Sequence, residues 1–178
     1  MPTGHLIATA TKLGISVRAV ADRLTELGYT HTADPTALLD TALSYRDTTL
    51  LSRDFDSIAP WLDRQHPVPT RHLISAATVL DISVRAVADR LTELGYTLAA
   101  DPATLPNSAL THNDTILISE NLNSGAPWLD LSQPVGPVHV IVAAMKTGQS
   151  VRAVVDRLVS LGFSEVRLTL DRGRPGDG

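Results

Sequence analysis

The stretch that decides the fold is SVRAVADRLTELGYT, which occupies residues 16–30 and recurs letter for letter at residues 83–97. A looser version, SVRAVVDRLVSLGFS, occupies residues 150–164. Successive copies begin 67 positions apart each time. Self-similarity at a fixed interval of this size is typical of repeat proteins whose units pack against their neighbours.

Each copy predicts two helices joined by a tight turn. In the first copy, apolar residues at helical spacing predict a short amphipathic helix over residues 5–13, which Gly14 ends. Ser16 is a good N-cap for a second helix, and Gly28 supplies the left-handed residue that ends it. Such a pair is a helix-turn-helix, with an apolar face inside and a charged face outside. In the second helix and its counterparts, the positions that we expect to be buried are Val17, Val20, Leu24 and Leu27.

The segment after each helix pair predicts a small β-ribbon. Residues 48–52 and 115–119 are β-branched and aliphatic runs between Asp-rich turns, so we expect short strands there. Trp61 and Leu62 can form a second strand that pairs with the first. Helices followed by a ribbon describe a winged helix-turn-helix, so the expected fold class is α+β, mainly α, built from tandem repeats of 67 residues.

The alignment of the copies predicts the domain boundaries. We expect a first winged helix-turn-helix-like repeat at residues 4–70, a second at 71–137, and a partial third at 138–178 that ends in a flexible tail. Proline-containing connectors separate the copies. The incomplete third copy indicates either a fragment of a longer protein or a terminal cap.

Composition excludes several classes of protein. The chain has no cysteine, which excludes disulfides, thiolate catalysis and cysteine-ligated zinc. No apolar run approaches the ~20 residues that a membrane span needs, and the first residues lack the regions of a signal peptide. We therefore expect a cytoplasmic protein that does not bind a membrane.

Charge decides between DNA and protein as the partner of the repeated helix. The first copy has a net charge of −2, the second −4 and the third +2, whereas DNA readers usually present a basic stripe. The charged positions of the repeated helix are balanced in sign, which indicates either a solvated face or a face that docks a protein partner. The candidate interaction face comprises Arg18, Asp22, Arg23, Glu26, Arg85, Asp89, Arg90, Glu93, Arg152, Asp156 and Arg157. DNA binding remains the alternative, which the basic third copy leaves open.

Nothing in the sequence predicts catalysis, a metal site or a cofactor. His5, His72 and His139 are equivalent positions in three separate copies, so they do not converge on one metal ion. LLSRDFD at residues 50–56 lacks a nucleophile elbow, and its aspartates become asparagines in the second copy. No glycine-rich phosphate loop is present. Two aromatic residues in identical APWLD settings, Trp61 and Trp128, are candidate anchors for recognition, although a core position is more common for such residues.

The pattern HLIxAAxxLxxSVRAVADRLxxLGY followed by LLSRDFDSIAPWLD resembles winged helix-turn-helix repeats in actinobacterial multidomain proteins. Those repeats accompany Hsp90-type ATPases and caspase-like or trypsin-like proteases in conflict systems. The resemblance implies a non-enzymatic adaptor that recruits or senses a protein partner or a fused effector domain. The alternative is a DNA-binding transcriptional regulator.

Overall fold

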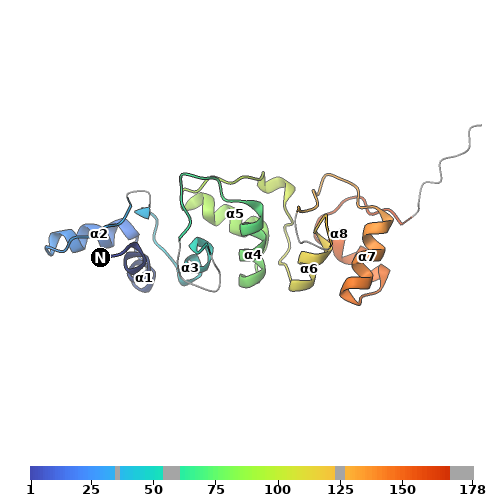
Figure 1. Cartoon of the computed structure of the whole chain (residues 1–178), viewed down its shortest axis with the longest axis horizontal. Helices are drawn as coiled ribbons and strands as arrows, with labels where there is room; N and C mark the ends of the chain where they lie inside the picture. Colours follow the sequence, from blue (N-terminus) through green and yellow to red (C-terminus); the bar gives the residue numbers. More distant parts are fainter. Residues whose placement is uncertain (35–36, 54–60, 123–126, 169–178) are drawn as a thin grey trace, which may run out of the picture.

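The computed structural model describes residues 1–34, 37–53, 61–122 and 127–168. In these residues the chain folds into helices that follow one another along one long axis, with α1 and α2 at one end and α7 and α8 near the other (Figure 1). The elements are α1 (Thr3–Leu13), α2 (Val17–Glu26), α3 (Tyr45–Leu51), α4 (Thr70–Leu80), α5 (Val84–Glu93), the short 3₁₀ helix η2 (Pro102–Thr104), α6 (His112–Leu117), α7 (Pro137–Thr147) and α8 (Val151–Ser160).

The predicted helix pairs are confirmed as α1/α2, α4/α5 and α7/α8. The serine before each second helix is its N-cap, because its hydroxyl accepts a hydrogen bond of 3.1 Å from the backbone N–H three residues on. Gly14 takes a left-handed φ of 65° between α1 and α2, as predicted. Local sequence is thus enough to form each pair.

The strands expected at residues 48–52 and 115–119 are wrong, because these residues belong to or directly follow the helices α3 and α6. Each of these helices begins with a capping box: the backbone N–H of Ser44 donates to Asp47, and that of Thr111 donates to Asp114. A short aliphatic run fits a strand or a helix, and the Ser/Thr-x-x-Asp pattern before it decides for the helix.

The β part of the expected fold class is correspondingly reduced. Over the described ranges the backbone makes isolated bridges rather than strands. Ser52 pairs with Trp61 in an antiparallel bridge, so the expected pairing of Trp61 with the preceding run is present at a single position. A parallel bridge joins Val68 to Leu98, and each of these two bridges has an equivalent 67 residues later.

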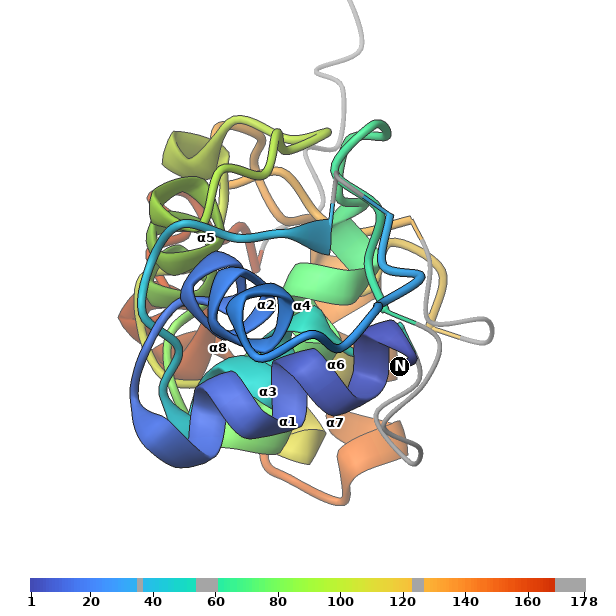
Figure 2. The same cartoon turned by 90° about the vertical axis from the view of Figure 1, so that its left-hand side faces the viewer.

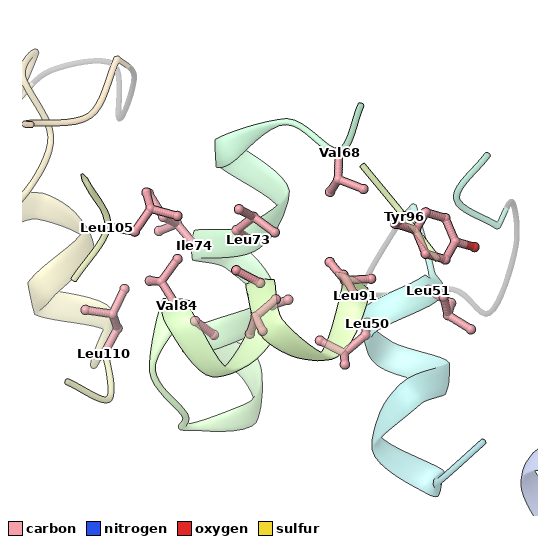
Figure 3. Close-up of a cluster of buried hydrophobic side chains, with 14 of the residues drawn as sticks. Leu50, Leu51, Val68, Leu73, Ile74, Val84, Leu91, Tyr96, Leu105 and Leu110 are labelled. Atoms are coloured by element: carbon pink, nitrogen blue, oxygen red, sulfur yellow. The ribbon is translucent and has the colours of Figure 1, made fainter. Parts of the chain in front are cut away.

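The short helices α3 and α6 lie between successive helix pairs and join them into one core. α3 contacts α1 and α4, and α6 contacts α4 and α7. Figure 3 shows Leu50 of α3 beside Leu91 on one side of α4/α5, while Leu110 approaches Val84 on the other. The middle pair is therefore covered on both sides.

Burial of the repeated helix follows this covering and corrects part of the prediction. In α5 and the residue after it, the four expected positions are all buried: they are Val84, Val87, Leu91 and Leu94. In the first copy, Leu24 is half-buried and Leu27 is 56% exposed. In the third, Val151 is 39% exposed. The pattern predicted which face is apolar, but neighbouring elements decide whether that face is covered.

Candidate interaction surfaces

The repeated helices α5 and α8 each use one arginine to hold the short helix that precedes their pair. Arg90 donates from Nε to Asp47 Oδ1 at 2.9 Å and from Nη2 to Oδ2 at 2.8 Å. Arg157 binds Asp114 in the same two-pronged way at 2.8 and 2.7 Å. The two carboxylates are nearly buried, at 1% and 2% exposure. A bidentate pair of this kind fixes both the position and the orientation of the docked helix.

Three further hydrogen bonds attach α3 to the pair α4/α5. Arg90 Nη2 also donates to the carbonyl of Ala42 at 2.9 Å. His72 donates from Nε2 to the carbonyl of Leu50 at 2.7 Å, and the Tyr96 hydroxyl donates to the carbonyl of Leu62 at 3.2 Å. The expectation that this histidine keeps its nitrogens in water is therefore wrong, because His72 is only 6% exposed.

The docking of α6 on α7/α8 repeats two of these bonds. Arg157 Nη2 donates to the carbonyl of Ala109 at 2.8 Å, and His139 Nε2 donates to the carbonyl of Leu117 at 2.7 Å. Phe163 stands at the tyrosine position and is 1% exposed. The two docking sites therefore share one design, made of a histidine, an arginine, a leucine and an aromatic ring.

The electrostatics of the pairs show that the charged forms are stabilised. Burial by itself raises the pKa of the Asp47 carboxyl, but hydrogen bonds from Arg90 and Ser44 outweigh burial and hold the pKa below its ordinary value. The pKa of Asp114 is lowered in the same way, against its burial, by Arg157 and Thr111. The bond to Asp47 raises the pKa of Arg90 in turn. Each pair stays ionised at neutral pH.

The first helix pair carries the same residues without a docked helix. Arg23 contacts Glu26 on its own helix at 2.8 Å and is 69% exposed. His5 is exposed, and so are Leu27 at 56% and Tyr29 at 58%. We call these four side chains, His5, Arg23, Leu27 and Tyr29, the open docking face.

A family model described as wHTH-Hsp90_Na associated matches three segments of the chain, residues 1–29, 42–96 and 109–163. The chain belongs to this family. The predicted resemblance to tandem winged helix-turn-helix repeats of Hsp90-associated proteins is thereby confirmed. No curated protein and no solved structure matches the chain.

The second and third wHTH-Hsp90_Na associated segments each contain a short helix, its bridge and the helix pair that receives it. Residues 42–96 include α3, α4 and α5, and residues 109–163 include α6, α7 and α8. The first segment, residues 1–29, contains only α1 and α2. The match to the family thus coincides with the docking contacts, and the first segment corresponds to the receiving pair alone.

The other charged positions of the predicted face make local contacts in this wHTH-Hsp90_Na associated chain. Arg18 is bonded to Asp40 in the loop that follows its helix, and Arg152 lies 3.9 Å from Asp156 one turn along α8. Arg85 is half-buried. The negatively charged positions, which are exposed in the structure, are Asp22, Glu26, Asp89, Glu93 and Asp156.

The two tryptophans lie at the seams between units. Trp61 and Trp128 are half-buried against the core, each in its bridge to the preceding short helix. The indole nitrogen of Trp61 lies so near Gly4 of α1 that a Cβ there would approach within 3.4 Å. This placement matches the common core role of such residues more closely than that of an exposed anchor.

One hollow in the described residues carries titratable side chains, and its chemistry is not repeated. The cavity of about 560 Å³ is lined in part by Asp63, His66 and Arg71, and His66 lies 2.9 Å from Asp63. The positions 67 residues later hold Asp130, Gln133 and Val138. Two of the three groups are lost, so this hollow is not a site common to the repeats.

The described residues contain no group of three or more His, Asp or Glu side chains placed to hold a metal ion. Two aspartates of LLSRDFD, Asp54 and Asp56, lie outside the described residues. Ser52, the serine of that motif, is 4% exposed and paired with Trp61. Among the helices that the structure describes, none has the length and apolar character needed to cross a membrane.

Proposed function

We propose that the chain is a non-enzymatic, tandem winged helix-turn-helix module that binds protein partners, recruiting or sensing them in a bacterial signalling or defence system. One observation carries the proposal: Arg90 and Arg157, on the helices that would enter a DNA groove, are engaged by buried aspartates of the preceding helices. The repeated helix acts twice within this chain as a receptor for another helix.

The exposed charges of α5 support a protein partner over DNA. Once Arg90 is paired, the exposed charged side chains of this helix are Asp89 and Glu93, both acidic. Carboxylates directed at phosphates are repelled, and phosphate attraction supplies most of the affinity of a DNA-binding protein. A partner with its own basic or apolar surface fits this helix better than a nucleic acid does.

DNA binding stays as the second candidate on one specific observation. Arg152 of α8 is 91% exposed, and the third copy as predicted, residues 138–178, has a net charge of +2. An exposed arginine on a repeated helix in a basic region is a starting point for phosphate contacts. The candidate is confined to this end of the chain.

The predicted boundaries 4–70, 71–137 and 138–178 remain a prediction, and the docking contacts favour units that begin one helix earlier. We propose that α3 forms a folding unit with α4/α5, and α6 with α7/α8, because each arginine–aspartate pair links residues 43 positions apart inside such a unit. The first pair α1/α2 is then a unit that lacks its short helix.

The experiment that tests the function compares DNA and protein binding by the full chain. Anisotropy with a labelled random-sequence duplex, measured from low to physiological salt, is expected to show no saturable binding. A photo-crosslinking residue at Asp22 or Asp89 is expected to capture protein from nuclease-treated lysate of the source cell. Tight duplex binding that falls steeply with salt would overturn the proposal in favour of the regulator.

A further inference from the structure

The open docking face is a complete copy of a site that is occupied elsewhere in the molecule. Ten residues of α2 and α5 are identical in sequence, VRAVADRLTE. The histidine, arginine, leucine and tyrosine that hold α3 on α4/α5 all recur 67 residues earlier as His5, Arg23, Leu27 and Tyr29. Figure 2 shows α1 and α2 foremost at this end of the molecule.

The two occupied sites define what such a site binds. Both occupants are short helices that begin with Ser/Thr-x-x-Asp, since Ser44 precedes Asp47 and Thr111 precedes Asp114. Both continue into an aliphatic segment whose backbone carbonyl, that of Leu50 or Leu117, accepts the histidine N–H. Carboxylate, carbonyl and aliphatic side chains are therefore the shared recognition elements.

We propose that the open docking face binds a short helix of a partner protein with the same chemistry: a Ser/Thr cap, an aspartate three residues later, and a following aliphatic pair. This inference rests on the proposed function and names the class of partner. Arg23 takes the partner's aspartate and His5 takes a backbone carbonyl. Leu27 and Tyr29 cover the aliphatic side chains.

The chemistry of the face favours this occupant over the other two. A nucleic acid offers phosphates to Arg23 but nothing that removes Leu27 and Tyr29 from water. A second copy of this chain carries suitable helices in α3 and α6, but their aspartates already hold Arg90 and Arg157. Releasing one of them would leave a buried charge unpaired, which is strongly unfavourable.

The probe is a labelled synthetic peptide with the sequence of residues 41–64 of this chain, which contains the α3 sequence and the Leu62 carbonyl. The full chain is titrated with it, and binding is followed by anisotropy and by two-dimensional NMR of His5 and Tyr29, which detects weak complexes. We expect saturable binding with shifts at these two residues. Because its aspartate is replaced, an Asp47→Asn peptide is expected to bind at least about tenfold more weakly.

Charge exchange separates a specific pair from general stickiness. We expect Arg23→Glu in the chain to lower the affinity for the unmodified peptide at least about tenfold, and an Asp47→Arg peptide to restore it. The matched control is Lys12→Glu on α1, which changes charge by the same amount outside the face and is expected to leave binding unchanged. Equal loss with both chain variants, or no rescue, would overturn the proposal.

Two further outcomes also count against it. Absence of any saturable NMR shift would overturn it, as would concentration-dependent dimerisation in sedimentation that Leu27→Asp abolishes, since that result assigns the face to a second copy. The proposed function is tested separately by the duplex titration and by crosslinking at Asp22 and Asp89. A chain that captures protein there but ignores the peptide keeps its function and loses only this partner class.

Discussion

The helices α2 and α5 have the same ten residues and the same serine cap, yet their surroundings differ. Leu27 after α2 is 56% exposed, whereas Leu94 after α5 is 2% exposed. Tyr29 and Tyr96 differ in the same way, at 58% and 5%. Identical local sequence therefore gives identical helices, while the burial of their faces depends on whether a short helix from another part of the chain covers them.

The opposite end of the molecule shows the complementary difference. Ile7 and Ile74 are buried at 2% and 1%, and α1 and α4 each have a short helix packed against them. Their counterpart Ile141 on α7 is 49% exposed, and Met145 beside it is 77% exposed. The inner units of a stacked array are covered on two sides, and the terminal units on one.

The largest expected effect comes from truncating the leucine that only one of the two helices buries. Leu94→Ala leaves a cavity between α5 and α3 and is expected to lower the free energy of unfolding by about 2–5 kcal/mol. Leu27→Ala, the matched change after α2, is expected to stay within about 0.5 kcal/mol. Urea unfolding followed by circular dichroism measures both. Equal losses would contradict the difference in covering.

The arginine pair is the next test. Arg90→Gln leaves the Asp47 carboxylate buried without its counter-ion, and we expect a loss of about 2–3 kcal/mol, below the range for a fully buried pair because Arg90 is 27% exposed. Arg23→Gln removes only a surface contact with Glu26 and is expected to be almost neutral. The same unfolding assay applies. A large effect of Arg23→Gln would show that α2 is covered in solution.

The histidines should differ by a smaller amount. His72→Ala removes the donor to the Leu50 carbonyl inside the fold and is expected to lower the free energy of unfolding by about 1–3 kcal/mol. His5→Ala changes an exposed side chain and is expected to stay within about 0.5 kcal/mol. Thermal melts of both variants beside the parent chain check this. If His5→Ala also lowers the melting temperature, then His5 has a structural partner.

The pH dependence gives the mildest test, because protonation leaves every side chain in place. The folded-state pKa values of Asp47 and Asp114 lie below the unfolded value of 3.8. Their contribution to stability is fully present above that value and is lost as the pH falls through the folded pKa. In urea titrations across acid pH, the parent chain is expected to lose stability more steeply than Asp47→Asn. Parallel curves would show that this carboxylate does not titrate with folding.

The sequence predicted the helix pairs well because their signals are local. Serine caps, a left-handed glycine and apolar side chains at helical spacing lie within fifteen residues of one another. The strands expected at residues 48–52 and 115–119 failed because a short aliphatic run is ambiguous. The capping boxes at Ser44 and Thr111 were the available signal for α3 and α6.

The candidate face was predicted only in part. The charged positions of the repeated helix were identified, but Arg90 and Arg157 were placed on a free surface, whereas each binds an aspartate 43 residues earlier. No spacing rule within one helix can indicate such a partner, because the contact is made by packing of separate elements. The same argument applies to His72, whose acceptor is a backbone carbonyl 22 residues away.

By itself, the sequence determined the helices, their caps, their apolar faces and their recurrence, since each depends on neighbours within a few turns of chain. Only the tertiary structure decided which copies of the same face are covered and which remain open. The physical reason is that burial is a property of two surfaces in contact, and the second surface is encoded elsewhere in the chain. Where it is missing, as at Leu27 and Tyr29, the same residues become a surface available for binding.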